Sequence, residues 1–412
     1  MRLPSLQSAV CQLLFVVAFA VAAAFGQSLD NGTVSGRVVD SASRSPLPGA
    51  NLSLAGTDIG GVSDRDDRFE IRQIPSGSYQ LITTYIGTQS DTTAVDVRVD
   101  ETSRVEIRLT QTALSIEGML VVGNREGQAR ALNLQQTADN ISNIVAAELI
   151  GRFPDPNIAE ALQRVPCLSV FRDQGEGRYV LIRGSEPRLT AVSIDGVETP
   201  APDGQFRFVA LDVIPSDQFA YIEVDKTLTP EMDADGIGGA INLVTRSAVD
   251  GGRSEITLGL GRNQLASDGI RQGSFSWGDR YGADREFGIR VGGSFHRTDR
   301  GTNANEPLYG LVDLGDGPLV VLADLKLRDY RIQRRRMSLT GNFDYQVGQG
   351  SSLFFRTIYS RFTDWELRRQ LRYRFDKGTP VSTTAVVGGR VERELKDRYE
   401  AQDIYSALVR LM

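Results

Sequence analysis

The sequence has 412 residues, with 46 basic and 52 acidic side chains, a formal net charge of −6, two cysteines and one histidine. This balance offers nucleic acid no basic surface, and a single histidine all but excludes histidine-based metal sites, Ser-His-Asp triads and Cys-His pairs. The 42 glycines and the lack of long amphipathic patterns predict a mainly β protein, and the length leaves room for two or three domains.

The first residues carry the pattern of a secretory signal peptide. Arg2 precedes an almost wholly apolar run over 13–25, and small residues stand just before Gln27, where cleavage is expected. The run is short for a comfortable membrane span. We interpret residues 1–26 as a signal peptide, with an N-terminal anchor helix as the alternative, and expect the mature chain outside the cytoplasm.

Residues 27–112 are predicted to form a small β-sandwich. Apolar and polar residues alternate over several short runs, among them 34–38 and 105–109. Turn-forming residues separate the runs at 46–49, 60–61 and 75–77. Short strands at such regular spacing are typical of a sandwich.

One turn of this region holds three acidic residues, Asp64, Asp66 and Asp67, which raises the question of a calcium site. The glycine and the closing glutamate of an EF-hand loop are missing at their required spacing. We therefore interpret the stretch as a solvated hairpin turn.

The stretches GRVVD at 36–40, PGA at 48–50, FEI at 69–71 and PSGSY at 75–79 resemble the carboxypeptidase regulatory-like domain. The family name does not imply peptidase activity in this chain, because the sequence offers no zinc ligand set.

Residues 124–247 follow a turn-rich break and are predicted to form a compact α+β domain. Asp155 is expected to cap a helix that has Pro156 at its first position and ends at Pro166. The apolar stripe of this helix consists of Ile158, Ala161, Leu162 and Val165. Short strands are expected from 168 and over 179–184, 191–194, 221–224 and 240–244. Asp195-Gly196 suits a type I′ hairpin turn.

The one cysteine beyond the signal peptide is Cys167, directly after this helix. A single thiol cannot form an internal disulfide, and we predict a small core residue rather than a nucleophile.

Several motifs follow one another in this domain: FPDPNIAEALQRVP at 153–166, DQGEGR at 173–178, IRG at 182–184, IDG at 194–196, IEV at 222–224 and GGAINLVT at 238–245. In this order they resemble the plug domain of TonB-dependent outer-membrane receptors. Cys167 departs from the family, which usually has glycine there. The resemblance implies that the helix is scaffolding of a plug inside a pore.

The segment 113–123, between the two domains, corresponds by this resemblance to the TonB box. An extended segment can add as an edge strand to a partner's sheet through main-chain hydrogen bonds. The residues expected to contact TonB are Glu117, Met119, Leu120, Val121 and Val122. A last sandwich strand or a plain linker is the alternative.

Two further roles in the plug are implied by the resemblance. Arg183 is expected to hold the plug to the barrel wall through polar contacts. The loop 197–208 is expected to face the substrate, with Glu198, Asp203, Gln205 and Arg207 as its polar residues.

Residues 248–412 follow a second turn-rich break and alternate apolar with polar residues in stretches of about ten, as transmembrane β-barrel strands do. Runs of this kind lie at 287–296, 337–347 and 371–375. A soluble sheet with one buried face has the same period, so the barrel is favoured by the leader and the plug motifs. His296 is expected to face the pore or its rim, and the basic run 334–336 is interpreted as a solvated strand end.

Together these segments predict a mainly β chain made of an N-terminal β-sandwich, an α+β plug and the first strands of a transmembrane antiparallel β-barrel. By resemblance, such receptors bind an extracellular nutrient and import it when TonB of the inner-membrane energising complex pulls the plug. No catalytic residue, metal or cofactor is expected. The N-terminal domain would lie in the periplasm, and the barrel would contact outer-membrane lipid.

For the substrate we favour an oligosaccharide or another bulky nutrient, because sandwich domains of this kind are common in such receptors, with a surface lipoprotein as a candidate partner. An iron-siderophore is the alternative. Two other classes stay open: a secreted or surface-attached binding protein with a sandwich module, and an enzyme. Detergent dependence and a hydrolase screen would distinguish them.

The third region is also expected to be incomplete. We count about eight candidate strands after residue 252, with a long extracellular excursion over 301–328. A barrel of about eight strands is filled by its own side chains, whereas barrels that hold a plug have about 22. The sequence alone therefore predicts a fragment that is truncated within the barrel.

Overall fold

The computed structural model describes residues 31–411 except 65–66, 112–125, 152–154, 156, 202–206, 231, 250, 266–267, 284, 316 and 348–350. The chain divides into two compact units, of which the first is formed mainly by residues up to 111 and the second mainly by residues from 112 onward. The expected signal peptide (1–26) and the expected TonB contacts lie outside the described residues.

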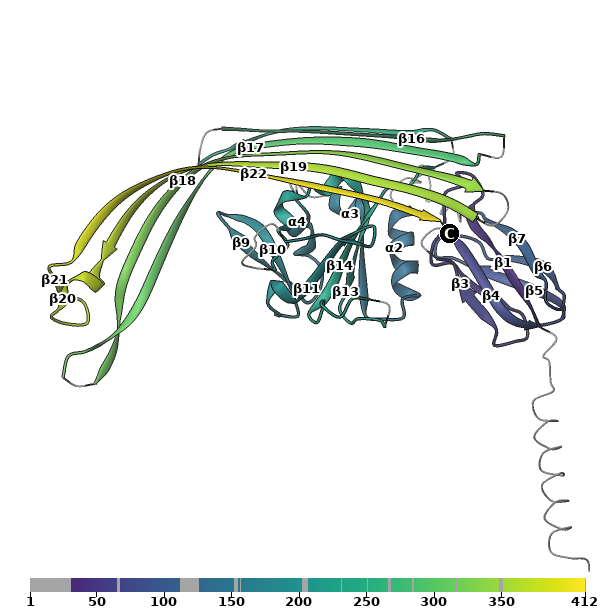
Figure 1. The fold of residues 1–412 in the computed structure, drawn as a ribbon, viewed down its shortest axis with the longest axis horizontal. Coiled ribbons are helices and arrows are strands. Elements are labelled where there is room, and N and C mark those ends of the chain that lie inside the picture. The colour runs from purple at the N-terminus through teal and green to yellow at the C-terminus, as the bar shows by residue number, and fades with distance from the viewer. Residues whose placement is uncertain are drawn as a thin grey trace, which may run out of the picture. The chain divides into compact units, whose positions relative to one another are not determined.

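The first unit is built from two sheets (Figure 1). Buried apolar side chains fill the space between them. Its strands are β1 (Asn31–Asp40), β2 (Asn51–Leu54), β3 (Gly60–Val62), β4 (Arg68–Pro75), β5 (Gly77–Thr84), β6 (Asp91–Val97) and β7 (Thr102–Leu109). One sheet has the order β4-β1-β7 and the other β3-β2-β5-β6. The alternating residues of β1 and β7 meet in the core, where Val34, Val38, Ile107 and Leu109 are all buried. The predicted sandwich is confirmed.

The second unit begins with a central domain, which we define as residues 126–247. It contains α2 (Glu126–Gln136), β8 (Ser142–Ala146), α3 (Ala147–Gly151), α4 (Ile158–Leu162), β9 (Leu168–Asp173), β10 (Glu176–Ile182), η1 (Pro187–Leu189), β11 (Thr190–Ile194), β12 (Val197–Glu198), η2 (Leu211–Val213), η3 (Ser216–Gln218), β13 (Phe219–Asp225) and β14 (Gly239–Thr245). Its main sheet has the order β12-β11-β14-β13-β8, and β9 pairs with β10 in a separate ribbon. The predicted α+β character and all five predicted strands are confirmed.

The helix α4 is shorter than predicted, and it begins at a different cap. Asn157, not Asp155, is the N-cap: its side chain accepts a hydrogen bond from the backbone N–H of Glu160 at 3.0 Å. Both residues are good caps by type, but the side chain of Asp155 instead pairs with Arg164. The predicted apolar stripe holds, because Ile158, Ala161, Leu162 and Val165 are all buried.

Two turns of the central domain depend on positive φ angles. Asp195 and Gly196 have φ values of 51° and 82°, which fits the predicted type I′ hairpin between β11 and β12. Cys167 has φ 66° and an exposed side chain. The prediction of a core cysteine is therefore wrong, because the left-handed turn after α4 directs this residue to the surface.

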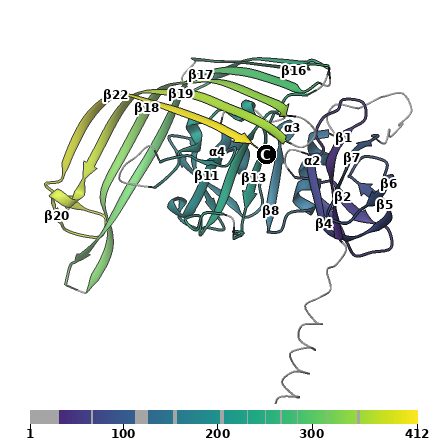
Figure 2. The same cartoon turned by 45° about the vertical axis from the view of Figure 1, so that its right-hand side comes forward.

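The rest of the second unit is one long sheet, with the order β15-β16-β17-β18-β19-β22. Its strands are β15 (Arg253–Asn263), β16 (Asp268–Tyr281), β17 (Phe287–Asp313), β18 (Pro318–Val347), β19 (Ser351–Arg374) and β22 (Arg390–Leu411), while η4 (Phe375–Lys377), β20 (Thr379–Pro380) and β21 (Val386–Val387) lie between the last two. Neighbouring strands are antiparallel throughout. Figure 2 shows β17, β18, β19 and β22 running side by side, with β20 at their far end.

The predicted long excursion over 301–328 is a paired extension of two strands and not an irregular loop. β17 and β18 stay paired through it, up to Asp313 and Pro318, so the strands simply continue as a long hairpin. The predicted count of about eight strands agrees with the eight described after residue 252, of which six form the long sheet while β20 and β21 pair with each other. Residues 301–307 are mostly polar on both faces and residues 319–323 are apolar on both, so the stretch lacks the alternation by which a strand is recognised.

The two faces of the long sheet differ in chemistry. On β18 the polar residues Ser338 and Asn342 are 2% and 5% exposed, while Met337 and Leu339, on either side of Ser338, are 51% and 60% exposed. The polar face packs on the central domain, and the apolar face points away from it. This is the reverse of a soluble sheet, and it is the arrangement of a strand with lipid on one side.

Candidate functional site

The central domain meets the long sheet at a buried ion network centred on Glu176, the first residue of β10. Its carboxylate lies 2.8 Å from Arg336 Nη2 and 3.0 Å from Arg300 Nη2, and it also pairs with Arg334. Asn157 Nδ2 donates a further hydrogen bond to it at 3.0 Å. One carboxylate of the central domain thus holds three guanidinium groups of the long sheet, which we call the wall.

Strand alternation explains why these arginines face Glu176. Arg334 and Arg336 are two residues apart on β18, so both project from the face that carries Ser338, and Arg335 projects from the other. Arg336 is 0% exposed and Arg334 is 2% exposed. Our interpretation of 334–336 as a solvated strand end is wrong, because the run lies in mid-strand against the central domain.

The network extends on both sides of Glu176. Arg336 Nε donates to the backbone carbonyl of Asp212 at 2.5 Å, and Arg334 Nε donates to Asp364 on β19 at 3.1 Å. Both guanidinium groups also lie over the ring of Phe362, at 5.8 Å for Arg334 and 5.2 Å for Arg336. The two arginines are thus held by charges, a carbonyl and an aromatic face at once.

The charge state of Glu176 follows from its neighbours. Burial alone would raise the pKa of this carboxyl, but the charges of Arg336, Arg300 and Arg334 outweigh burial and hold the pKa well below its usual range. Burial raises the pKa of Asp212 nearby. Glu176 therefore stays ionised and supplies the charge that pairs with the wall.

The remaining contacts between the two parts are also mostly polar. Asn342 Nδ2 donates to Thr245 Oγ1 at 2.8 Å, and Thr340 Oγ1 donates to Gln218 Oε1 at 3.0 Å. Gln174 Nε2 donates to Glu366 Oε2 at 2.7 Å. Apolar contact is confined to a few wall residues that join the central core, chiefly Ile358, Phe362 and Ile404.

Among the described residues, the side-chain hydrogen bond of Arg183 lies within the central domain and not on the wall. This residue is exposed, has φ 54°, and its guanidinium donates to the carbonyl of Gly238 within the central domain at 3.4 Å. In the part of the chain that the structure describes, the polar contacts with the wall include those of Glu176, Gln218 and Thr245. Sequence reasoning missed Glu176 because it lies in a motif that we used only for its resemblance.

The structure describes two of the four residues expected to face the substrate. Glu198 is exposed at the end of β12, and Arg207 is exposed and paired with Asp235. Asp203 and Gln205 lie outside the described residues, as do all five residues expected to contact TonB. His296 lies on the polar face of β17, where Thr298 Oγ1 is 3.4 Å from its ring.

The acidic turn of the first unit contains a buried ion pair. Asp67 is 0% exposed and pairs with Arg37 through two hydrogen bonds of 2.8 and 2.9 Å. Asp64 accepts a hydrogen bond from the backbone N–H of Arg68. The interpretation as a solvated turn is therefore wrong for Asp67, and no group of metal-binding side chains occurs among the described residues.

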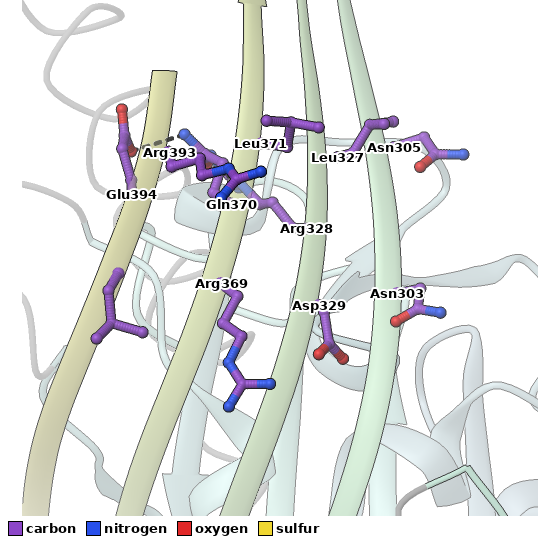
Figure 3. A pocket seen from close by; sticks show the side chains of 11 residues that line it. Asn303, Asn305, Leu327, Arg328, Asp329, Arg369, Gln370, Leu371, Arg393 and Glu394 are labelled. Atoms are coloured by element: carbon purple, nitrogen blue, oxygen red, sulfur yellow. Dashed lines mark hydrogen bonds between the residues drawn. The ribbon is translucent and has the colours of Figure 1, made fainter. Parts of the chain in front are cut away.

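A hollow of about 650 Å³ lies on the extension of β17, β18, β19 and β22 (Figure 3). Asn303, Asp329, Arg369 and Leu395 are register partners across these four strands. They belong to the face that points away from the central domain. On the other face, Arg328 Nε donates to Gln370 at 2.6 Å and Gln370 donates to Glu394 at 2.7 Å.

Among the described helices, none is long and apolar enough to cross a membrane.

Two family models match the chain. Residues 34–121 match the CarboxypepD_reg-like domain, and residues 133–240 match the TonB-dependent Receptor Plug Domain. No curated protein sequence matches the chain.

Similar solved structures include a mutant of the ferric enterobactin receptor of Pseudomonas aeruginosa, with 13% identity, 68% of this chain and 56% of that chain covered, and a TM-score of 0.34. The siderophore receptor PirA of the same organism has 14% identity, covers 66% of this chain and 60% of its own, and has a TM-score of 0.32. A cohesin–dockerin complex from Acetivibrio cellulolyticus has 20% identity over 23% of this chain and 66% of that chain, with a TM-score of 0.19. The chain thus spans little more than half the length of the two receptors, and the assignment of family rests on the domain matches.

Proposed function

Because this chain belongs to the TonB-dependent receptors and carries a CarboxypepD_reg-like domain ahead of its plug domain, we propose that it forms part of an outer-membrane active transporter. A nutrient binds from outside, TonB pulls the plug, and the nutrient enters the periplasm. The first unit lies in the periplasm in this proposal. The chain carries out no covalent chemistry and holds no cofactor.

The observation that carries the proposal is the chemistry of the interface between the central domain and the wall. An apolar interface would behave as a core that comes apart only on unfolding. Here Glu176, Gln174 and Gln218 of the plug side make hydrogen bonds or ion pairs that water can replace. A plug attached in this way can be displaced while both parts stay folded.

The same network explains why an energised partner is needed. Separating Glu176 from its arginines leaves buried charges uncompensated, which costs about 3–5 kcal/mol until water reaches them. Thermal motion alone therefore leaves the pore closed. A pull on the segment 113–123 supplies the work, with Glu117 and 119–122 pairing as an added strand on TonB.

For the substrate we propose an oligosaccharide or another bulky polar nutrient. Beyond the central domain, the same face of the long strands carries planar polar side chains that are hydrogen-bonded to one another. Arg328, Gln370 and Glu394 form one row, and Arg372 is bonded to Asp324 in another. Such groups suit hydroxyl-rich ligands. Exposed Glu198 and Arg207 belong to the plug loop that would face the same space. An iron-siderophore is the alternative substrate.

The Leu120→Pro substitution tests the transport proposal. Proline removes a main-chain donor and fixes φ, so a strand added to TonB through this segment loses its register. We expect uptake to be abolished and substrate binding to intact cells to be unchanged, with Leu120→Ala as the control that keeps uptake. Normal uptake by the proline variant would place the coupling strand elsewhere.

Cell fractionation distinguishes the membrane transporter from a secreted or surface-attached binding protein. If the apolar face of the long sheet lies in lipid, the protein requires detergent for extraction and migrates differently on a gel before and after heating. A secreted or surface-attached binding protein would be released by buffer alone, and that result would overturn the proposal.

A further inference from the structure

Three arginines stand side by side on the outward face of the long sheet. Arg271 of β16 is the register partner of Arg297 of β17, and Arg297 is the register partner of Arg335 of β18. Directly opposite side chains in a sheet lie about 5 Å apart at Cβ, and like charges in that position destabilise the pairing. We call Arg271, Arg297 and Arg335 the arginine row.

The acidic side chains around the arginine row do not balance it. Arg297 pairs with Asp299 at 2.9 Å, and Arg335 donates to the neutral Gln333 at 2.8 Å. Arg271 has no side-chain hydrogen bond or ion pair within the described ranges, and both Arg271 and Arg335 are exposed. A row of this kind is stable when an external anion lies over it.

The arginine row lies directly beyond the apolar band of the same face. Phe295 and Met337 are each two residues from the row and are 39% and 51% exposed, and Leu258 is 81% exposed. From Phe287 to Phe295 the band measures about 27 Å along β17, which at the ~40° tilt of strands in membrane barrels gives a height of about 21 Å, comparable with the ~25 Å apolar band of such barrels. The guanidinium groups therefore stand at the depth of lipid headgroups.

Connection lengths identify the side of the membrane. At the end of the sheet remote from the row, β16 joins β17 between Tyr281 and Phe287, and β18 joins β19 between Val347 and Ser351. At the end with the row, β17 and β18 continue to Asp313 and Pro318. Short turns face the periplasm and long excursions face outward in barrels of this type.

From this geometry we propose that the arginine row binds the phosphate groups of a phosphorylated lipid in the outer leaflet of the membrane. Guanidinium groups bind phosphate bidentately, and the apolar band below supplies the surface for the acyl chains. The proposal rests on the proposed function in one respect, since it takes the outward face to be in lipid.

The test compares two double variants with the same loss of charge. R271Q/R335Q removes the two exposed arginines of the row, and R369Q/R393Q removes two exposed arginines of the same face that lie farther along the strands, at the hollow in Figure 3. The full-length protein is mixed in detergent with bis-phosphorylated lipid A or with fully dephosphorylated lipid A. Bound lipid is counted by native mass spectrometry.

We expect the unaltered protein to bind the phosphorylated lipid at least about tenfold more tightly than the dephosphorylated one. R271Q/R335Q should lose this preference, and R369Q/R393Q should keep it. R271K/R335K should keep most of it, which guards against a defect in folding. Raising the salt concentration should weaken the preference, because exposed charges are screened.

Equal binding of both lipids by the unaltered protein would overturn the proposal, and so would an unchanged preference in R271Q/R335Q. Complete displacement of the lipid by millimolar inorganic phosphate would also overturn it, because the site would then be one for a free anion. The readout needs no transport, so its failure leaves the transport proposal intact. Extraction of the protein without detergent would instead defeat both.

Discussion

The first unit and the long sheet use the same alternation of apolar and polar residues in opposite ways. In the first unit, Val38 of β1 and Leu109 of β7 are both 0% exposed. In the long sheet, Leu258 and Leu260 of β15 are 81% and 89% exposed, and the fully buried side chain is the charged Arg336. The period of a strand therefore tells which residues share a face, but not which face is covered by protein.

The difference also shows what holds each region together. The first unit is stabilised by the burial of apolar area, at roughly 25 cal/mol for each Å². In the long sheet the apolar side chains point away from the central domain, and the contact with that domain is made mostly by charged and amide side chains. Such a contact is specific without being a hydrophobic core, so the two regions should respond differently to substitution.

The largest effect is expected on the buried polar face. Glu176→Gln keeps the size of the side chain but leaves Arg336 buried without its carboxylate and Arg334 with Asp364 as its nearest one. We expect a loss of about 3–5 kcal/mol in the free energy that fixes the central domain to the wall. Urea-induced exposure of the domain to protease, followed in detergent, measures this loss.

Glu186→Gln is the matched control for this substitution, because Glu186 pairs with Arg188 where both side chains are about half exposed. An exposed pair contributes between zero and about 1 kcal/mol. Equal resistance of all three proteins to protease would mean that the network around Glu176 does not secure the domain.

The apolar core of the first unit should be nearly as sensitive. Leu109→Ala leaves a cavity in a fully buried site and should cost about 2–5 kcal/mol of the free energy of unfolding of that unit. Val62, which is 41% exposed, is the control, and Val62→Ala should stay within about 0.5 kcal/mol. The midpoints of denaturant unfolding give both values. Equal shifts would contradict the assignment of the core.

A substitution on the exposed face of the long sheet tests whether that face lies in water or in lipid. Leu339 is 60% exposed, so in a water-soluble sheet Leu339→Arg would change stability by no more than about 0.5 kcal/mol. In a membrane the same change should cost about 2–4 kcal/mol, because it places a charge in hydrocarbon. Folding into lipid vesicles, titrated with urea, measures the cost. A negligible effect would mean that this face lies in water.

Much of the fold could be predicted from the sequence because its signals are local. The stripe of α4, the turn at Asp195 and the strands of the central domain each depend on residues that are close along the chain. The cap of α4 was placed wrongly because Asp155 and Asn157 are both suitable, and the choice depends on Arg164 and on backbone contacts. Cys167 was misplaced for a similar reason, since a positive φ cannot be read from residue type alone.

The candidate site could be predicted only in part. The phase of the run 337–347, continued by three residues, would have put Arg334 and Arg336 on the face of Ser338, so this signal was present in the sequence and was missed. Their partner could not be inferred in the same way. Glu176 is 158 residues from Arg334, and only the packing of the domain on the wall brings the two together.

The smallest expected effect is a pH dependence confined to the first unit. Asp67 is fully buried beside Arg37, and burial, which outweighs the pull of that arginine, raises the pKa of its carboxyl to about 6. The folded state then binds a proton more tightly than the unfolded chain, whose aspartate has a pKa near ~3.9. Stability is therefore greatest below about pH 4 and falls as the pH rises from there through about 6.

The size of this fall is at most about 3 kcal/mol, from the difference between the two pKa values. Asp67→Asn keeps the shape of the side chain and removes its titration. Between pH 4 and pH 6, the free energy of unfolding should therefore fall less steeply with pH in the variant than in the unaltered protein. The measurement is the free energy of unfolding of the first unit at several pH values, in the unaltered protein and in the variant. Identical slopes would show that Asp67 remains ionised throughout, held by Arg37, and stability that rises with pH only in the unaltered protein would reverse the sign assigned here. Either result would also change the comparison of the two regions, because the first unit would then contain a buried ion pair of the kind found at Glu176.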